Sequence, residues 1–141
     1  MTLYLDASAV VPTLVEEGAS HAVGDYLGAA SDPLVVSDFA AAEVASALSR
    51  LVRMTAIGRE AAETVLREFD AWRAIATTGV ELSSADVRLA NLIVRRFELG
   101  LRAPDALHAA VCQRGDHTLV TLDSRLAAAA EALGVRGDCL A

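Results

Sequence analysis

The sequence contains no lysine, and all 12 of its basic residues are arginine. A phosphate-binding P-loop requires a lysine that contacts the phosphates, and Schiff-base chemistry requires a lysine amine. Both mechanisms are therefore excluded. The 19 acidic residues outnumber the basic ones, which gives a formal net charge of −7. This charge argues against a sequence-independent nucleic-acid coat, which needs a basic surface, but it is compatible with a nuclease whose active site is rich in carboxylates.

Cysteine is also scarce. Cys112 and Cys139 are the only two, which is too few for a disulfide framework, and they lack the spacing of a metal site. No apolar run reaches the roughly 18 residues of a membrane span, and the amino-terminal segment lacks the basic start of a signal peptide. We therefore expect a soluble cytoplasmic protein with no membrane segment. The 141 residues suit a single domain, residues 1–141.

Short apolar runs alternate with helical patterns along the chain. The stronger runs predict buried strands at Thr2–Leu5, Leu34–Ser37 and Thr118–Leu122, and weaker ones predict strands at Val80–Leu82 and Val135–Arg136. Helices are predicted over Ser8–Glu16, Ser20–Ala29, Phe39–Met54, Arg59–Ala76, Ser84–Leu99, Pro104–Arg114 and Ser124–Leu133. This alternation favours an α/β fold, with a mostly parallel sheet of four to five strands covered by helices on both faces.

Acidic residues follow the predicted strands. Asp6 comes directly after the first strand, and Asp123 directly follows Thr118–Leu122. Asp38 and Glu43 follow the second strand, and Asp105 lies in the first turn of the helix that begins near Pro104. Because the carboxyl ends of parallel strands share one edge of the sheet, these side chains can converge there. Taken singly, each aspartate also fits a helix cap or a carboxylate at the positive end of a helix dipole.

Glu43 fits neither structural role. It lies about one turn inside the predicted helix, on the edge of an apolar stripe that includes Phe39 and Ala47. A capping box that starts at Asp38 would place its acid at Ala41 instead. A half-buried acid needs a partner or a metal, and converging carboxylates repel one another unless a cation neutralises them. Oxygen ligands without histidine or cysteine suit Mg²⁺ or Mn²⁺, which commonly serve phosphate chemistry.

Four segments of the chain carry a family resemblance. They are Asp6-Ala7-Ser8-Ala9 after the first strand, Glu43-Val44 with Ala47-Leu48 and Arg50, Leu101–Ala110, and Thr121-Leu122-Asp123. In this order and spacing they resemble the PIN-domain family and, more narrowly, the VapC toxins of bacterial type II toxin–antitoxin pairs. The resemblance spans nearly the whole chain.

The resemblance implies a three-layer α/β/α fold and Mg²⁺- or Mn²⁺-dependent endoribonuclease activity on an RNA substrate. It also implies inhibition by a VapB-type antitoxin whose carboxyl-terminal segment lies over the active site. Asp6, Glu43, Asp105 and Asp123 match the family's four acids, which would bind the metal and act in catalysis. Ser8 matches a position where a hydroxyl often supports the site. A homodimer that assembles further with antitoxin is expected from the resemblance and from the apolar surfaces of Phe39–Met54 and Arg59–Ala76.

Two other functions stay open at this point. An aspartyl-phosphate phosphatase would use Asp6 as its nucleophile, but Ser8 stands where such enzymes have a second aspartate, and they also need a lysine. A non-catalytic binding module would use the acids only as helix caps.

Some polar residues near the acids are open to two interpretations. Arg95, Arg96 and Arg102 precede Asp105 and could contact RNA phosphates, or they could form a solvated helix face. His108 lies three residues after Asp105 and either faces the site or packs in the helix. The role of Asp116 is also open.

Overall fold

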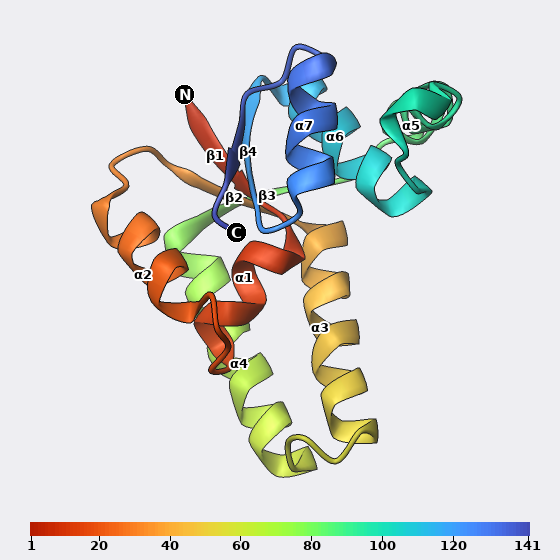
Figure 1. Ribbon diagram of the computed structural model, residues 1–141. Helices are drawn as coiled ribbons and strands as arrows, with labels where there is room; N and C mark the ends of the chain where they lie inside the picture. Colours follow the sequence, from red (N-terminus) through yellow and green to blue (C-terminus); the bar gives the residue numbers. More distant parts are fainter.

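The sheet has five strands, all parallel. In the computed structural model, which describes residues 1–141, the strands pair in the order β3-β2-β1-β4-β5 (Figure 1). They are β1 (Thr2–Leu5), β2 (Leu34–Ser37), β3 (Thr77–Val80), β4 (His117–Thr121) and β5 (Gly137–Cys139). The chain adds β2 and β3 on one side of β1 and then crosses to add β4 and β5 on the other. The order therefore reverses between β1 and β4, and open α/β sheets bind ligands at the carboxyl ends of strands at such a point.

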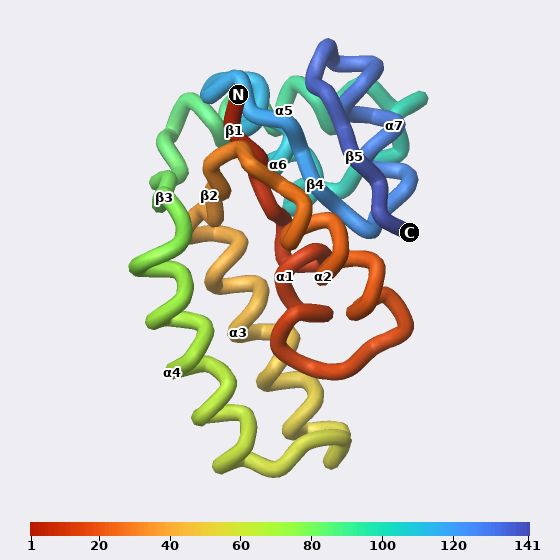
Figure 2. The backbone as a smooth tube through the Cα atoms, turned by 90° about the vertical axis from the view of Figure 1, so that its left-hand side faces the viewer, coloured from red at the N-terminus to blue at the C-terminus, as the bar shows by residue number.

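Helices cover both faces of the sheet. One face carries α1 (Ala7–Leu14), α2 (Ser20–Ala29), α3 (Asp38–Arg53) and α4 (Arg59–Ala76). The other carries α5 (Ser84–Val94), a short 3₁₀ helix (Phe97–Leu99), α6 (Ala103–Gly115) and α7 (Ser124–Ala132). Helices α3 and α4 run side by side and extend well beyond the sheet (Figures 1 and 2). None of the helices is both long enough and apolar enough to span a membrane.

The central strands alternate between two hydrophobic cores. In β1, Leu3 and Leu5 belong to the core beneath α1, α3 and α4, whereas Tyr4 belongs to the core beneath α5, α6 and α7. Val120 and Leu119 of β4 divide in the same way. Successive side chains point to opposite faces of a strand, so a continuous apolar run of four or five residues fills both cores. The predicted three-layer α/β/α fold with a parallel sheet is confirmed.

The central strands match their predicted positions and the edge strands do not. The predicted bounds of β1 and β2 are confirmed, and β4 begins and ends one residue before its prediction. The predicted strand Val80–Leu82 is wrong, because β3 ends at Val80, and the predicted strand Val135–Arg136 is wrong, because β5 starts at Gly137. Both are edge strands whose residues are half-buried or exposed. They therefore need few apolar residues and leave a weak pattern in the sequence.

The helix predicted over Ser84–Leu99 is interrupted. Helix α5 ends at Val94, and the chain passes through the 3₁₀ helix to Gly100, which has a left-handed φ of 65°. The buried carboxylate of Asp86 ties α5 to α6 by accepting hydrogen bonds from Arg114 Nε at 2.6 Å and Nη2 at 3.0 Å. Burial alone would raise the pKa of Asp86, but the hydrogen bonds from Arg114 and Ser83 outweigh it and lower the pKa. This ionic contact helps to fix α6, which carries Asp105 and His108.

Candidate active site

Asp6 occupies the point where the strand order reverses. It directly follows β1, caps α1 and is only 5% exposed. Its Oδ1 accepts hydrogen bonds from Ser8 Oγ at 2.6 Å and from the Ala9 backbone N–H at 3.1 Å, and its Oδ2 accepts one from Thr121 Oγ1 at 2.6 Å. Burial raises the pKa of this carboxyl, although the three hydrogen bonds and His108 act in the opposite direction. The predicted supporting residue, Ser8, therefore contacts Asp6 directly and also accepts the Leu122 N–H at 2.9 Å.

Glu43 lies on α3 beside a buried histidine of α6. The Glu43 side chain is 31% exposed, and its Oε1 contacts His108 Nε2. The other ring nitrogen of His108, Nδ1, lies 2.7 Å from the Tyr4 hydroxyl on β1. The same hydroxyl lies 2.7 Å from Ser37 Oγ at the end of β2. His108 therefore faces the acidic edge and joins α3, α6 and the two strands.

Asp105 and Asp123 form the outer part of the site. Asp105 lies in the first turn of α6, and Asp123 caps α7 by accepting the backbone N–H groups of Arg125 and Leu126. Both line one surface pocket with Gly100, Arg102, Ser124 and Arg125. Partial burial and the neighbouring charge of Asp123 raise the pKa of Asp105, while His108 and Arg102 lower it in part. These two carboxylates are close enough to repel each other.

Two residues connect the inner acids, Asp6 and Glu43, with the outer acids, Asp105 and Asp123. Thr121 donates to Asp6 and accepts the Asp123 backbone N–H at 3.0 Å. His108 contacts Glu43 and is near enough to Asp6 and Asp105 to oppose the rise in the pKa of both carboxyls. The four predicted acids are therefore gathered at the carboxyl edge of β1 and β4.

No arginine forms an ion pair with any of these four acids. No three histidine, cysteine, aspartate or glutamate side chains meet closely enough at one point to hold a metal ion. The structure thus gathers acidic charge at one edge without showing a formed metal centre.

The three predicted arginines are placed differently from one another. Arg102 lines the outer pocket with Asp105 and Asp123. Arg95 and Arg96 do not line it, and their side chains contact Asn91 and Glu98 respectively. Arg125 also lines this pocket, and its guanidinium forms no ion pair. RNA binding by the predicted arginines stays a prediction, and the geometry favours Arg102 over the other two.

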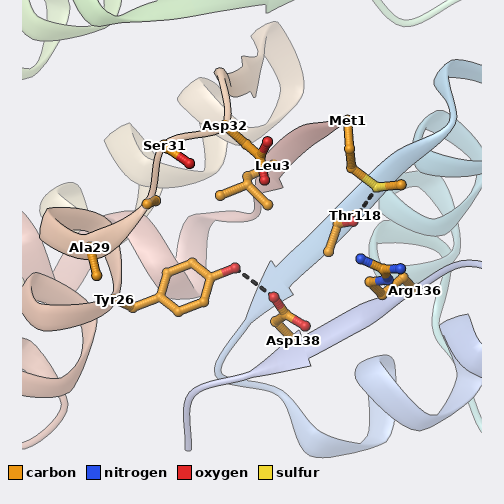
Figure 3. A pocket seen from close by; sticks show the side chains of 10 residues that line it. Met1, Leu3, Tyr26, Ala29, Ser31, Asp32, Thr118, Arg136 and Asp138 are labelled. Atoms are coloured by element: carbon orange, nitrogen blue, oxygen red, sulfur yellow. Dashed lines mark hydrogen bonds between the residues drawn. The ribbon is translucent and has the colours of Figure 1, made fainter.

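A second pocket lies at the opposite, amino-terminal edge of the strands (Figure 3). Met1, Leu3 and Thr118 form one side of it, and Arg136 is also at its wall. The Tyr26 hydroxyl donates a 2.6 Å hydrogen bond to Asp138 across it. Burial, followed by this contact with Asp138, raises the pKa of Tyr26 above its ordinary value. None of the four gathered acids reaches this pocket, so it is separate from the candidate site.

We compared the sequence with models of known protein families. A model of the PIN domain matches residues 3–132. The chain belongs to the PIN domain family. No curated protein sequence matches this PIN domain protein.

Solved structures share the PIN fold of this chain. FitAcB from Neisseria gonorrhoeae is 14% identical, with a TM-score of 0.78 over 98% of this chain and 97% of that chain. Mycobacterium tuberculosis VapC20, described as a sarcin-ricin loop cleaving toxin, is 17% identical, with a TM-score of 0.70 over 90% and 94%. DNA-bound VapBC from Salmonella typhimurium is 12% identical, with a TM-score of 0.70 over 100% and 99%. At these identities the similarity concerns the fold.

Three residues of the site are missed or left undecided by the sequence. His108 carries a weak signal, because a residue three positions after Asp105 shares its helix face. Thr121 and Arg125 carry none that separates them from an ordinary strand threonine and an ordinary helix arginine. Their roles come from the approach of β4 to β1 and of α7 to α6, which a local pattern does not encode.

The charge of Asp105 should reduce stability at neutral pH. Because its folded pKa is raised, its protonated form contributes stability at low pH that is lost as the pH rises through that pKa. In EDTA at pH 7, Asp105→Asn should therefore melt at the same temperature as the wild type or higher, and this difference should disappear below the unfolded carboxyl pKa. An acid that served only the helix dipole would instead cost about 0.3–1 kcal/mol when removed.

Thermal melts of wild type and Asp105→Asn in EDTA, at pH 7 and in acid, test this expectation. Glu131→Gln, an exposed acid late in α7, is the matched control and should show no such gain. A lower melting temperature of Asp105→Asn at pH 7 would contradict the account of repelling carboxylates.

Proposed function

We propose that this PIN domain protein is a metal-dependent endoribonuclease and the toxin of a type II toxin–antitoxin pair. PIN domains are nucleases, which supports the general class. The observation that carries the proposal is the position of Asp6, Glu43, Asp105 and Asp123, all at the carboxyl edge of the two strands where the sheet order reverses. A phosphatase or a module of helix caps accounts less well for Glu43, which caps no helix.

The chemistry of the four acids fits a hard divalent cation. All four offer carboxylate oxygens, the donors that Mg²⁺ and Mn²⁺ prefer. Their charge is not balanced by an arginine, and the charge of Asp123 raises the pKa of Asp105. Side-chain rotations would be needed for the inner and outer acids to share one ion. We assign metal binding to these four residues. When bound, such an ion activates water and stabilises developing charge on phosphate oxygens.

The surrounding residues have distinct roles in this proposal. Ser8 and Thr121 hold the two oxygens of Asp6, so that the buried carboxylate keeps one orientation. Arg102 and Arg125 flank the outer acids on the surface pocket and would bind RNA phosphates, since guanidinium groups pair well with phosphate oxygens. These two positive charges also offset the repulsion between an acidic protein and RNA.

The partner in this proposal is a VapB-type antitoxin. The structural relatives include toxin–antitoxin complexes, some of them bound to DNA. An arginine from the antitoxin would insert among the four acids, because a planar guanidinium pairs with carboxylates and supplies the positive charge that they lack. Homodimerisation of the toxin is part of the same proposal and is tested by its mass in solution.

Cleavage of single-stranded RNA should require Mg²⁺ or Mn²⁺ and should leave 5′-phosphate and 3′-hydroxyl ends. Asp123→Asn should lower kcat by about 100-fold or more, because several kcal/mol of charge stabilisation would be lost. Asp25→Asn, which changes an exposed acid on α2, is the control and should cut like the wild type. The measurement is a gel assay with end-group analysis. Cleavage that persists in excess EDTA would contradict the proposal.

Arg125→Ala should weaken RNA binding rather than chemistry. Loss of a charge-assisted hydrogen bond to phosphate is worth about 1.5 kcal/mol, which corresponds to a roughly tenfold higher KM. The same change at Arg136, on the opposite edge of the sheet, should leave KM unchanged. Steady-state kinetics with one RNA substrate measures both variants. Equal KM values for Arg125→Ala and the wild type would remove Arg125 from the proposed RNA surface.

A further inference from the structure

His108 is held between two aromatic side chains in the interior. Its side chain is 3% exposed, and its ring centroid lies 5.6 Å from that of Tyr4 and 5.2 Å from that of Phe39. A buried imidazole needs partners for both of its nitrogens. His108 has them on two different elements, Tyr4 on β1 and Glu43 on α3. Its ring is therefore fixed both by packing and by hydrogen bonds.

The hydrogen bonds from Ser37 through Tyr4 and His108 to Glu43 form a series in which each group donates to the next. An ionised Glu43 carboxylate only accepts, so His108 Nε2–H donates to it, and a neutral imidazole then accepts the Tyr4 O–H at Nδ1. The Tyr4 oxygen accepts from Ser37 Oγ, which accepts the Ala40 N–H at 3.0 Å. No buried side-chain nitrogen or oxygen lacks a partner.

This series of hydrogen bonds ends at Glu43, a proposed metal ligand whose carboxylate has no other hydrogen-bond partner. Asp6 is held by Ser8, Thr121 and a backbone N–H, and Asp123 is held as a helix cap. Glu43 is partly exposed and has His108 as its only hydrogen-bond partner, through Oε1 alone. Its Oε2 makes no contact with a protein donor. Without His108 the side chain could turn from the acidic edge toward solvent.

We propose that His108 is a positioning residue that holds the Glu43 carboxylate at the acidic edge through its Nε2–H, with Tyr4 and Ser37 fixing the orientation of the imidazole. The inference rests on the proposed function, in which Glu43 is a metal ligand. Groups that orient a ligand in this way commonly affect metal affinity about 10- to 100-fold. His108 would therefore act on metal binding without touching the ion or the RNA.

Two substitutions separate the two nitrogens of His108. The amide nitrogen of His108→Gln can occupy the place of Nε2 and donate to Glu43, whereas that of His108→Asn occupies the place of Nδ1 and reaches only Tyr4. The probe is Mn²⁺ alone, titrated calorimetrically into the full chain without RNA. His108→Asn should bind Mn²⁺ about tenfold or more weakly than the wild type. His108→Gln should recover most of this loss, and His21→Asn on the exposed face of α2 should bind like the wild type.

Equal affinities of folded His108→Asn and His108→Gln would show that the histidine serves packing alone and would overturn the inference. If His108→Asn does not fold, Tyr4→Phe decides instead, because it removes only the hydroxyl that orients the ring. A loss of about threefold or more in Mn²⁺ affinity would then support the inference, and unchanged affinity would overturn it. A wild type that binds no Mn²⁺ refutes the proposed function itself, and the inference with it.

Discussion

The buried carboxylate of Asp6 is the constraint on which the rest of the site depends. A buried acid is tolerated only where hydrogen bonds satisfy its oxygens, and the partners of Asp6 come from α1 and from β4. Thr121 can reach Asp6 because β4 pairs directly with β1, and this pairing is a consequence of the strand order. The same threonine accepts the Asp123 backbone N–H, so one hydroxyl holds both the Asp6 carboxylate and the residue that caps α7. The burial of the Asp6 carboxylate therefore depends on the pairing of β4 with β1.

The charge at this edge explains the arrangement of the basic residues. Three exposed acids elsewhere, Asp38, Glu63 and Glu98, have arginine partners, as in the pair between Arg73 and Asp38 at 2.6 Å. The four gathered acids have none, although Arg102 and Arg125 line the same outer pocket as Asp105 and Asp123. This leaves the carboxylates available to a cation and the guanidinium groups available to phosphate. Such a separation suits the hydrolysis of a phosphodiester, in which both groups act on one substrate.

The sequence alone predicted the central parts of this architecture better than its periphery. Strands buried on both faces, such as Thr2–Leu5, need unbroken apolar runs, and these are visible without a structure. The edge strand Thr77–Val80 buries little, so its composition does not distinguish it. The convergence of the four acids follows from a general property of parallel sheets. The links that connect them, above all the contact of His108 with Glu43, depend on how α6 packs against α3 and β1, which no local pattern specifies.

The central claim is that the carboxyl edge of β1 and β4 binds a divalent cation. Anomalous diffraction from crystals of the full chain grown with Mn²⁺ tests it most directly. We expect a manganese peak within coordination distance of Asp6 and of at least one outer acid, Asp105 or Asp123. Ordered carboxylates without manganese at this edge, or manganese only in the pocket at the opposite edge of the sheet, would contradict the account.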